Sequence, residues 1–331
     1  MALKNSQYDA VMRTYEEIRS RHEAEYDERL REVREALPAY RSLENQLVRL
    51  NAEAARRGLL DPEASTADLE LQIAKLRRAK ISLLEEAGYP SDYTEMTYDC
   101  PLCRDTGYVD NGKCRCFRRI SARILQAESA EGSSFQNMAF SDFQMSFYSD
   151  KIKDERTERS DRENAAEAFR IAVETAERVG QKSEGVIFYG NTGLGKTMLS
   201  KCMASAVLKD GKTALYFSAQ ELFDLLADSA FGRDPDAAES AHIIFHCDLL
   251  VIDDLGTELL NSFVETQLFR LINERQMRPC TTVISTNLDP IKDLTGRYTE
   301  RIFSRLISSY RLVPLTGDDI RMKKAMTGGN L

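Results

Sequence analysis

The stretch GNTGLGKT at residues 190–197 decides the fold of this chain. Its members are Gly190, Asn191, Thr192, Gly193, Leu194, Gly195, Lys196 and Thr197. The pattern G-x-x-x-x-G-K-[ST] is that of a phosphate-binding loop, in which glycines let backbone N–H groups surround the phosphates. In such a loop Lys196 would reach the β- and γ-phosphates of a nucleotide, and Thr197 would offer its hydroxyl to Mg²⁺. The sequence therefore predicts a nucleotide site here.

The segments on either side of this loop have the secondary structure that it requires. Residues 186–189 form a short apolar run, which predicts a strand. Residues 198–209 are typical of a helix, and Gly211 is placed to end it. A helix that starts at the loop adds its N-terminal dipole to phosphate binding. This setting disfavours the alternative, a glycine-rich turn without a ligand.

Short apolar runs alternate with helical stretches along the second half of the chain. The predicted strands cover residues 185–189, 213–218, 248–252, 280–285 and 311–315, after a first helix at 163–179. Strands that alternate with helices usually pair in parallel and are covered on both faces. We therefore predict an α/β domain with a five-stranded parallel sheet over residues 161–331.

Two of these strands end in polar residues that complete a candidate ATPase site. Asp253 and Asp254 close the apolar run 249–252. Asp253 is expected near the metal, and Asp254 could orient an attacking water. Asn287 follows the strand at 280–285 and could contact the γ-phosphate or its water. The alternative for the two acids is a strand end that faces solvent.

Three arginines recur at every fourth position after the last of these strand ends. Arg297, Arg301 and Arg305 are therefore expected to share one helix face. The functional interpretation is an arginine finger, offered to a neighbouring subunit to stabilise transition-state charge. The alternative is a solvated basic face.

The first third of the chain is highly charged and helical in pattern. Apolar residues at steps of three and four predict a helix that ends or kinks at Pro38, a second helix at 40–57 and a third at 65–87. This region could be a helical packing module or a docking surface for a partner protein, and the two interpretations are compatible.

The domain organisation follows from these patterns. Residues 131–160 carry several phenylalanines, which need partners to pack against, so we expect an ordered linker there. An N-terminal domain is expected at 1–130 and the ATPase domain at 161–331.

Four cysteines lie close together within the predicted N-terminal domain. They are Cys100, Cys103, Cys114 and Cys116, with turn-forming residues between the two pairs. A tetrahedral Zn²⁺ ion needs four soft ligands that tight turns bring together. An iron–sulfur cluster, a redox dithiol and a cluster without metal are the alternatives. Structural zinc is the interpretation that we favour.

Bulk composition bounds the class of protein. The formal net charge of −8 argues against a uniformly positive surface, but it leaves room for a local basic groove. Hydrophobic residues make up 42% of the chain, which is enough for a buried core. The apolar runs are too short to span a bilayer, and the N-terminus lacks the pattern of a signal peptide. We therefore expect a soluble cytoplasmic protein.

Four motifs, taken together, resemble those of a known family. In chain order they are the phosphate loop, the Asp-Asp strand end, the Ser-Thr-Asn strand end and the segment ERIFSRL at 300–306. The resemblance is to the AAA+ ATPases of the DnaC/DnaI helicase-loader group and the related IstB transposition helpers, and it covers residues 135–331. It implies that residues 190–197 are the Walker A loop, that Asp253 and Asp254 are Walker B, and that Asn287 is sensor 1. Arg305 resembles the finger that acts on a neighbouring subunit, with Arg301 as the alternative. Arg321 resembles the sensor 2 arginine.

The chain departs from the general AAA+ pattern at two places. Most AAA+ proteins have Glu where this chain has Asp254, and the shorter side chain implies slow hydrolysis, which suits a timed switch better than a processive motor. Only residues 316–331 follow the last predicted strand. A C-terminal helical lid is therefore expected to be almost absent, as in the loader group.

The cysteine segment is similar to the zinc-bearing N-terminal domain of DnaI-type loaders, which IstB proteins ordinarily lack. The resemblance thus implies an ATP-dependent loader that places a replicative DnaB-type helicase on single-stranded DNA during replication. It also implies self-association through the ATPase domain, and ATP, Mg²⁺ and structural Zn²⁺ as cofactors. The alternative is an IstB-type ATPase helper of a transposase. A small-molecule kinase is disfavoured, because Asn287 and the arginine segment fit it poorly.

Overall fold

The computed structural model describes residues 5–60, 67–110, 112–132, 134–151, 153–182, 184–232 and 237–326. The chain divides into two compact units, one of Arg13–Gly112 and one of Met1–Met12 with Lys113–Leu331. Within the described residues, no helix has the length and apolar character needed to cross a membrane. The predicted boundaries at 130 and 160 stay predictions.

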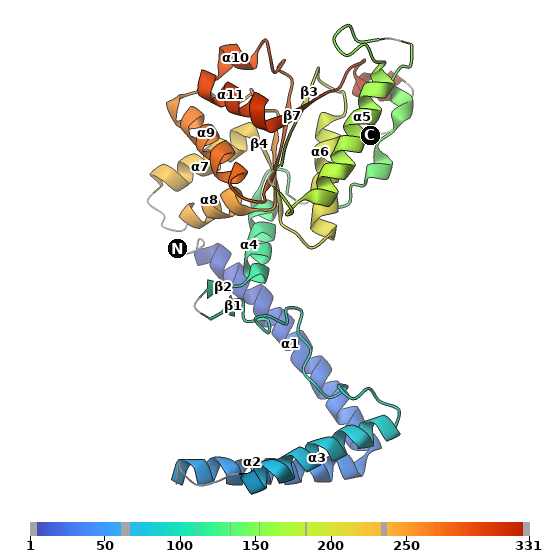
Figure 1. Ribbon diagram of the computed structural model, residues 1–331, viewed down its shortest axis with the longest axis vertical. Helices are drawn as coiled ribbons and strands as arrows, with labels where there is room; N and C mark the ends of the chain where they lie inside the picture. The colour runs from blue at the N-terminus through green and yellow to red at the C-terminus, as the bar shows by residue number, and fades with distance from the viewer. Residues whose placement is uncertain are drawn as a thin grey trace. The chain divides into compact units, whose positions relative to one another are not determined.

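The unit Arg13–Gly112 is helical, with one strand of a short hairpin at its end. Its helices are α1 (Asn5–Ala36, which starts in the other unit), α2 (Pro38–Leu60) and α3 (Ala67–Glu86), and the hairpin strands are β1 (Tyr108–Val109) and β2 (Gly112–Lys113). Pro38 opens α2, a position where the missing N–H costs nothing. Helices α2 and α3 lie side by side (Figure 1). The first two residues of the predicted helix 65–87 lie outside the described residues.

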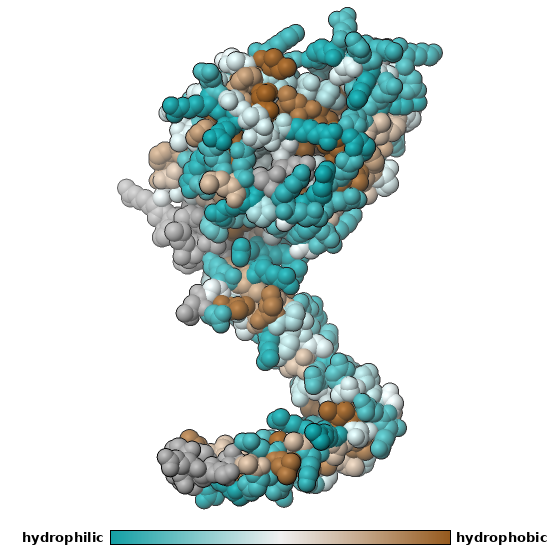
Figure 2. Space-filling model, viewed as in Figure 1, coloured by the Kyte–Doolittle hydropathy of each residue, from teal (hydrophilic) through white to brown (hydrophobic). Residues whose placement is uncertain are grey.

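The surface of this helical hairpin is mainly polar. Figure 2 shows hydrophilic residues over most of its visible face, with separate hydrophobic ones between them. Exposed apolar side chains include Val48, Leu71 and Ile81. The buried cluster beneath is small and consists of Leu30, Val33, Tyr40 and Leu84. The Tyr40 hydroxyl is 2.7 Å from the Thr94 hydroxyl, which ties the segment after α3 to this core.

The other unit is built on a five-stranded parallel sheet, as predicted. Its strands are β3 (Glu184–Tyr189), β4 (Ala214–Ser218), β5 (Leu249–Asp253), β6 (Thr281–Thr286) and β7 (Tyr310–Pro314), in the order β4-β5-β6-β3-β7. Each predicted strand is found within one residue at either end. The α/β fold class of the sequence prediction is confirmed, and the apolar runs are strands because both faces of the sheet are buried.

Helices cover both faces of this sheet (Figure 1). On one side lie α5 (Asp161–Arg178) and α6 (Lys196–Lys209). On the other lie α7 (Ala219–Phe231), α8 (Ala237–His246), α9 (Ser262–Gln276), α10 (Leu294–Arg297) and α11 (Glu300–Ser309). The start of α5 is fixed by a capping box, in which Ser160 and Glu163 exchange side-chain and backbone hydrogen bonds.

Four further elements belong to this unit. They are α4 (Arg115–Glu128), η1 (Phe140–Asp142), η2 (Met145–Phe147) and α12 (Ile320–Met326). The segment around η1 and η2 packs on the ATPase core, because Phe135, Phe143 and Tyr148 are buried in the same hydrophobic cluster as residues of α5 and α6.

The predicted common helix face for Arg297, Arg301 and Arg305 is wrong. Helix α10 ends at Arg297, and Tyr298 and Thr299 are extended before α11 begins. The physical reason is Glu258, whose carboxylate is buried and accepts a hydrogen bond from the Tyr298 hydroxyl. Arg297 donates to the backbone oxygen of Glu258 at 2.7 Å. These contacts hold the chain out of a helical path.

Candidate nucleotide site and cysteine cluster

The sheet order brings the predicted site residues to one edge. Strand β3 leads into the phosphate loop, its neighbour β6 leads to Asn287, and the next strand, β5, ends at Asp253. The carboxyl ends of parallel strands meet at the same edge of a sheet, where open α/β sheets bind their ligands. The loop, the two acids and Asn287 therefore converge, although up to about a hundred residues separate them in the chain.

The phosphate loop needs glycine for steric as well as conformational reasons. Gly193 has a φ of 76°, and a Cβ atom on it would lie 2.0 Å from Oδ1 of Asp319. Gly195 has a φ of 89° and caps the N-terminus of α6. The backbone N–H groups at the start of α6 are thus left open toward the loop, as an anion site requires.

Lys196 lies at the centre of the loop and is almost fully buried. Its Nζ atom donates to the backbone oxygens of Gly190 and Asn191 at 2.8 and 2.7 Å, and to Oδ1 of Asn287 at 2.8 Å. Burial lowers the pKa of the Lys196 ammonium to about 8, partly offset by the charges of Asp254 and Asp253. A phosphate brought to the loop would supply the counter-charge that this ammonium lacks.

Asp253 is held by three side-chain hydroxyls. Thr197 Oγ1 lies 3.1 Å from its Oδ2, and Tyr216 and Ser285 also donate to its carboxylate. The sequence prediction named Thr197 but not Tyr216 or Ser285. For Ser285 a signal exists, because continuing the pairing of Ile252 with Ile284 places it beside Asp253. Tyr216 looks like an ordinary strand residue and carries no such signal.

Asp254 lies next to this cluster in a different environment. Its φ is 54°, in the left-handed region, and its backbone N–H donates to Oγ of Ser285 at 3.0 Å. Burial and the charge of Asp253 raise the pKa of the Asp254 carboxyl. Nδ2 of Asn287 lies 3.5 Å from Oδ1 of Asp254. A carboxylate with a raised pKa accepts a proton more readily, and Asp254 also lines the cavity above the loop.

A cavity of 560 Å³ opens above the loop. Its polar lining includes Lys196, Thr197, Asp254, Asn287 and Arg321. Apolar and aromatic residues also line it, namely Met138, Phe143, Phe147, Tyr148 and Ile320, together with the polar Asp142, Gln144 and Lys201. Ligand pockets commonly combine such an apolar lining with a few polar groups.

Most of the apolar lining of the cavity comes from the predicted linker, 131–160, for which the sequence predicted packing but no part in a site. The rings of Phe143 and Tyr148 stack at 5.6 Å, and the Tyr148 hydroxyl donates to the backbone oxygen of Leu194 at 2.8 Å. The segment 138–148 is thereby attached to the phosphate loop. The group of phenylalanines was the available signal.

The three remaining arginines differ in position. Arg321, at the start of α12, lines the nucleotide cavity, and α12 is tied to the loop by a hydrogen bond from the Ile320 N–H to the Gly193 oxygen at 3.0 Å. Arg301 and Arg305 lie on α11, exposed, along a surface depression with Phe269 and Ser304. A finger offered to a neighbouring subunit has to be exposed in this way.

The four cysteines of the predicted metal site lie together. The sulfur atoms of Cys100, Cys103, Cys114 and Cys116 are all within 4.8 Å of one another, and all four residues are buried. Four thiolates around Zn²⁺ at about 2.3 Å would be spaced at about 3.8 Å, so the donor set fits a tetrahedral ion. The Gly107 N–H also points at the Cys103 sulfur, at 3.4 Å.

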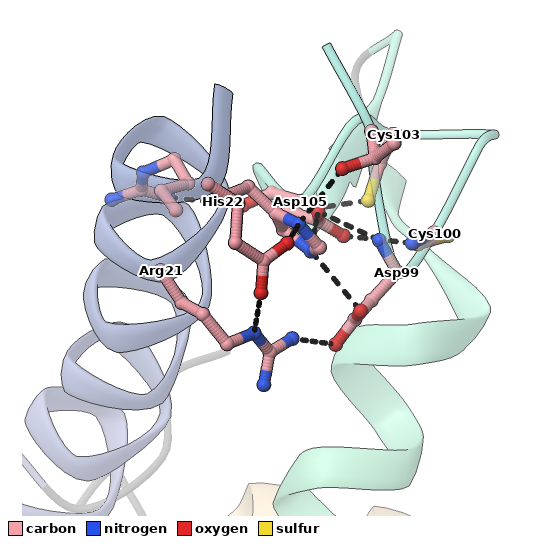
Figure 3. A network of polar contacts seen from close by, with 10 residues as sticks. Arg21, His22, Asp99, Cys100, Cys103 and Asp105 are labelled. Atoms are coloured by element: carbon pink, nitrogen blue, oxygen red, sulfur yellow. Dashed lines mark hydrogen bonds and ion pairs between the residues drawn. The ribbon is translucent and has the colours of Figure 1, made fainter. Parts of the chain in front are cut away.

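A polar network anchors the first cysteine pair to α1 (Figure 3). The buried carboxylate of Asp105 accepts from the backbone N–H groups of Asp99 and Cys100 at 3.0 and 2.8 Å. His22, on α1, places Nε2 3.0 Å from Oδ1 of Asp99, and Arg21 donates to Oδ2 of Asp99 at 2.8 Å. Such contacts fix the backbone that carries metal ligands. Sequence reasoning missed them.

The sheet order, the loop and the acids define an ATP-binding protein with an AAA+ fold. The sequence matches the family model for IstB-like ATP binding proteins over residues 142–327, more than half of the chain, and the chain belongs to this family.

Proteins of two kinds are similar in sequence. The insertion sequence ATP-binding protein y4pL of Sinorhizobium fredii is 28% identical over 138 residues, which are 40% of this chain and 54% of that protein. The chromosomal replication initiator protein DnaA of Zymomonas mobilis is 33% identical over 144 residues, 43% of this chain and 28% of that protein. The chain thus spans about half the length of the first relative and less than a third of the second.

Solved structures were also compared. The crystal structure of the DnaC helicase loader has a TM-score of 0.44 at 20% identity, covering 56% of this chain and 100% of that one. The crystal structure of DnaI has a TM-score of 0.44 at 21% identity, covering 56% of this chain and 92% of that one.

Proposed function

We propose that this chain hydrolyses ATP slowly and uses the nucleotide to time its binding to a DNA-processing partner. Thr197 and Asp253 offer the hard oxygen atoms that Mg²⁺ prefers, and the ion would neutralise charge on the phosphates. Lys196 binds the β- and γ-phosphates, and Asn287 holds the water. Asp254 accepts a proton from that water as its oxygen bonds to the γ-phosphorus and the bond to the β-phosphate oxygen breaks. ADP and phosphate are the products.

The partner that we propose is a replicative DnaB-type helicase, which this protein would load onto single-stranded DNA in the cytoplasm. The observation that carries the proposal is the buried cysteine cluster, attached to a helical unit in the same chain as the nucleotide site. A structural Zn²⁺ ion held by Cys100, Cys103, Cys114 and Cys116 would fix a docking module. The polar surface of α2 and α3, with separate apolar side chains, suits a reversible contact.

Co-purification tests the helicase partner. An immobilised DnaB-type hexamer should retain the full chain, and the amount retained should differ between ATP and ADP. Lys196→Ala should make retention insensitive to the nucleotide. Cys100→Ser/Cys103→Ser should abolish retention while ATP binding persists. If the helicase retains no protein with either nucleotide, the loader proposal fails.

A second candidate, an ATPase helper of a transposase, is supported by the IstB-like family match and by the insertion-sequence relative. It requires that ATP drive assembly of the chain on double-stranded DNA and that the assembly stimulate a transposase. Electron microscopy of the protein with duplex DNA and ATP decides this. Filaments on duplex DNA, together with no helicase retention, would favour the helper over the loader.

A further inference from the structure

Helix α4 begins with a concentration of positive charge. Arg115, Arg118, Arg119 and Arg123, here called the α4 arginine patch, are all exposed, and the stretch 113–123 contains no acidic residue. The chain as a whole carries a formal net charge of −8. The patch is therefore a local exception to the charge of the protein.

The patch arginines have no counter-charge within the part of the chain that the structure describes. Several exposed arginines elsewhere pair with carboxylates, as Arg170 does with Glu167 and Glu174. No patch guanidinium forms an ion pair or hydrogen bond with a described residue. Like charges at i and i+4 destabilise a helix, and Arg115, Arg119 and Arg123 have this spacing. A bound polyanion would relieve that repulsion.

A depression beside α4 gives the patch a defined shape. Arg115 and Arg118 line it together with Thr213, His246 and Asp248. The single acid there is engaged, because Oδ2 of Asp248 accepts from the Thr213 N–H and hydroxyl at 2.8 and 2.7 Å. Burial lowers the pKa of His246, which disfavours its charged form. The guanidinium of Arg119 extends toward the turn at Gly211.

The patch is separate from the nucleotide site. Thr213 and Asp248 directly precede β4 and β5, so the depression lies at the amino edge of the sheet. The phosphate loop, Asp253 and Asn287 lie at the carboxyl edge. A ligand on the patch would leave the ATP cavity open.

We propose that the α4 arginine patch binds the phosphate backbone of a nucleic acid. Guanidinium groups match phosphate oxygens in a two-pronged geometry. Arg115 and Arg123 are about 12 Å apart along a helix axis, which spans about three or four phosphates of one strand. No exposed aromatic side chain lies on α4 for base stacking, so recognition is of the backbone and independent of sequence. The inference rests on the proposed function only in the choice of nucleic acid as the partner.

Fluorescence anisotropy of a labelled oligonucleotide with the full chain, over a series of salt concentrations, tests the patch. Both a single strand and a duplex are titrated. Arg115→Gln/Arg118→Gln/Arg119→Gln should weaken binding at least about tenfold and reduce the slope of log affinity against log salt by about two to three. The same three positions changed to lysine should keep most of the binding.

A matched control removes three other exposed arginines that have no acidic partner among the described residues. It is Arg49→Gln/Arg77→Gln/Arg78→Gln, on α2 and α3, and it should bind as the wild type does. Retained ATP affinity shows that each variant is folded. Three results would overturn the proposal. They are equal losses of oligonucleotide affinity in both triple variants, a salt slope that is unchanged in the α4 variant, and polyglutamate that displaces the labelled oligonucleotide as effectively as unlabelled oligonucleotide does. Helicase retention, measured on the α4 variants alone, separates this outcome from failure of the loader function.

Discussion

ATP binding should be coupled to the uptake of a proton by Lys196. The buried ammonium has a pKa of about 8, and phosphate oxygens beside it would restore the charged form. At one pH unit above 8 only about a tenth of the free protein carries this charge, so the affinity for ATP should fall about tenfold, or about 1.4 kcal/mol. At pH 8 each binding event should take up about half a proton. The phosphates of ATP lose their last proton near pH 6, well below this window.

Isothermal titration calorimetry in pairs of buffers with different ionisation enthalpies measures this uptake directly. Lys196→Arg is the matched control, because a guanidinium stays charged throughout and its binding should not take up protons. Affinity that is constant from about pH 7 to pH 9, with no buffer dependence, would refute the reasoning. The same pKa affects the stability of the free protein. Its Lys196 pKa lies below the unfolded value of 10.5, so the unfolded chain binds more protons between about 8 and 10.5 and stability should rise with pH there.

Three further predictions concern other parts of the chain. Glu258→Ala removes the buried acceptor of the Tyr298 hydroxyl and should lower the free energy of unfolding, measured by urea titration, by about 3 kcal/mol. Glu258→Gln should lower it less, and a loss below about 1 kcal/mol for the alanine variant would contradict the role of Glu258. Arg305→Ala should reduce the ATP hydrolysis rate by about a thousandfold and leave ATP affinity unchanged, and normal turnover in it with a loss in Arg301→Ala would move the finger to Arg301. Cys103→Ser should lower the zinc content of the purified protein, measured by atomic emission, and should make the segment 13–112 sensitive to protease. A zinc content equal to that of the wild type would exclude the cluster as the metal site.

Sequence predicted the sheet well, because each strand is a short run rich in apolar or β-branched residues that is separated from the next by a helical stretch. The pattern LLVIDD, for example, fixes both the extent of β5 and the position of Asp253 at its end. The convergence of the loop, Asp253 and Asn287 follows from the strand order β4-β5-β6-β3-β7, which the sequence did not predict. A phosphate loop between a strand and a helix has few other structural solutions.

Sequence did not predict contacts that depend on tertiary packing. The arginine spacing at Arg297, Arg301 and Arg305 suited a helix, but the buried acceptor at Glu258 fixes Tyr298 in an extended conformation. Periodicity carries no information about an acid that lies some forty residues away. Phe143 and Tyr148 lie within the predicted ordered linker, whose phenylalanines were expected to pack, but their place in the lining of the cavity was not predicted.

The left-handed backbone at Asp254 favours Asp over Glu at this position. At a φ of 54° most side chains clash with their own backbone, and Asp and Asn are the residues that tolerate the conformation best. Of the two acids, Asp is therefore the one that this turn accepts at the lower conformational cost. Asp254→Gly should relieve about 1 kcal/mol of strain and raise the melting temperature while hydrolysis is lost. The residue proposed to drive the reaction is then also a weak point of the fold, and stability and catalysis compete at this position.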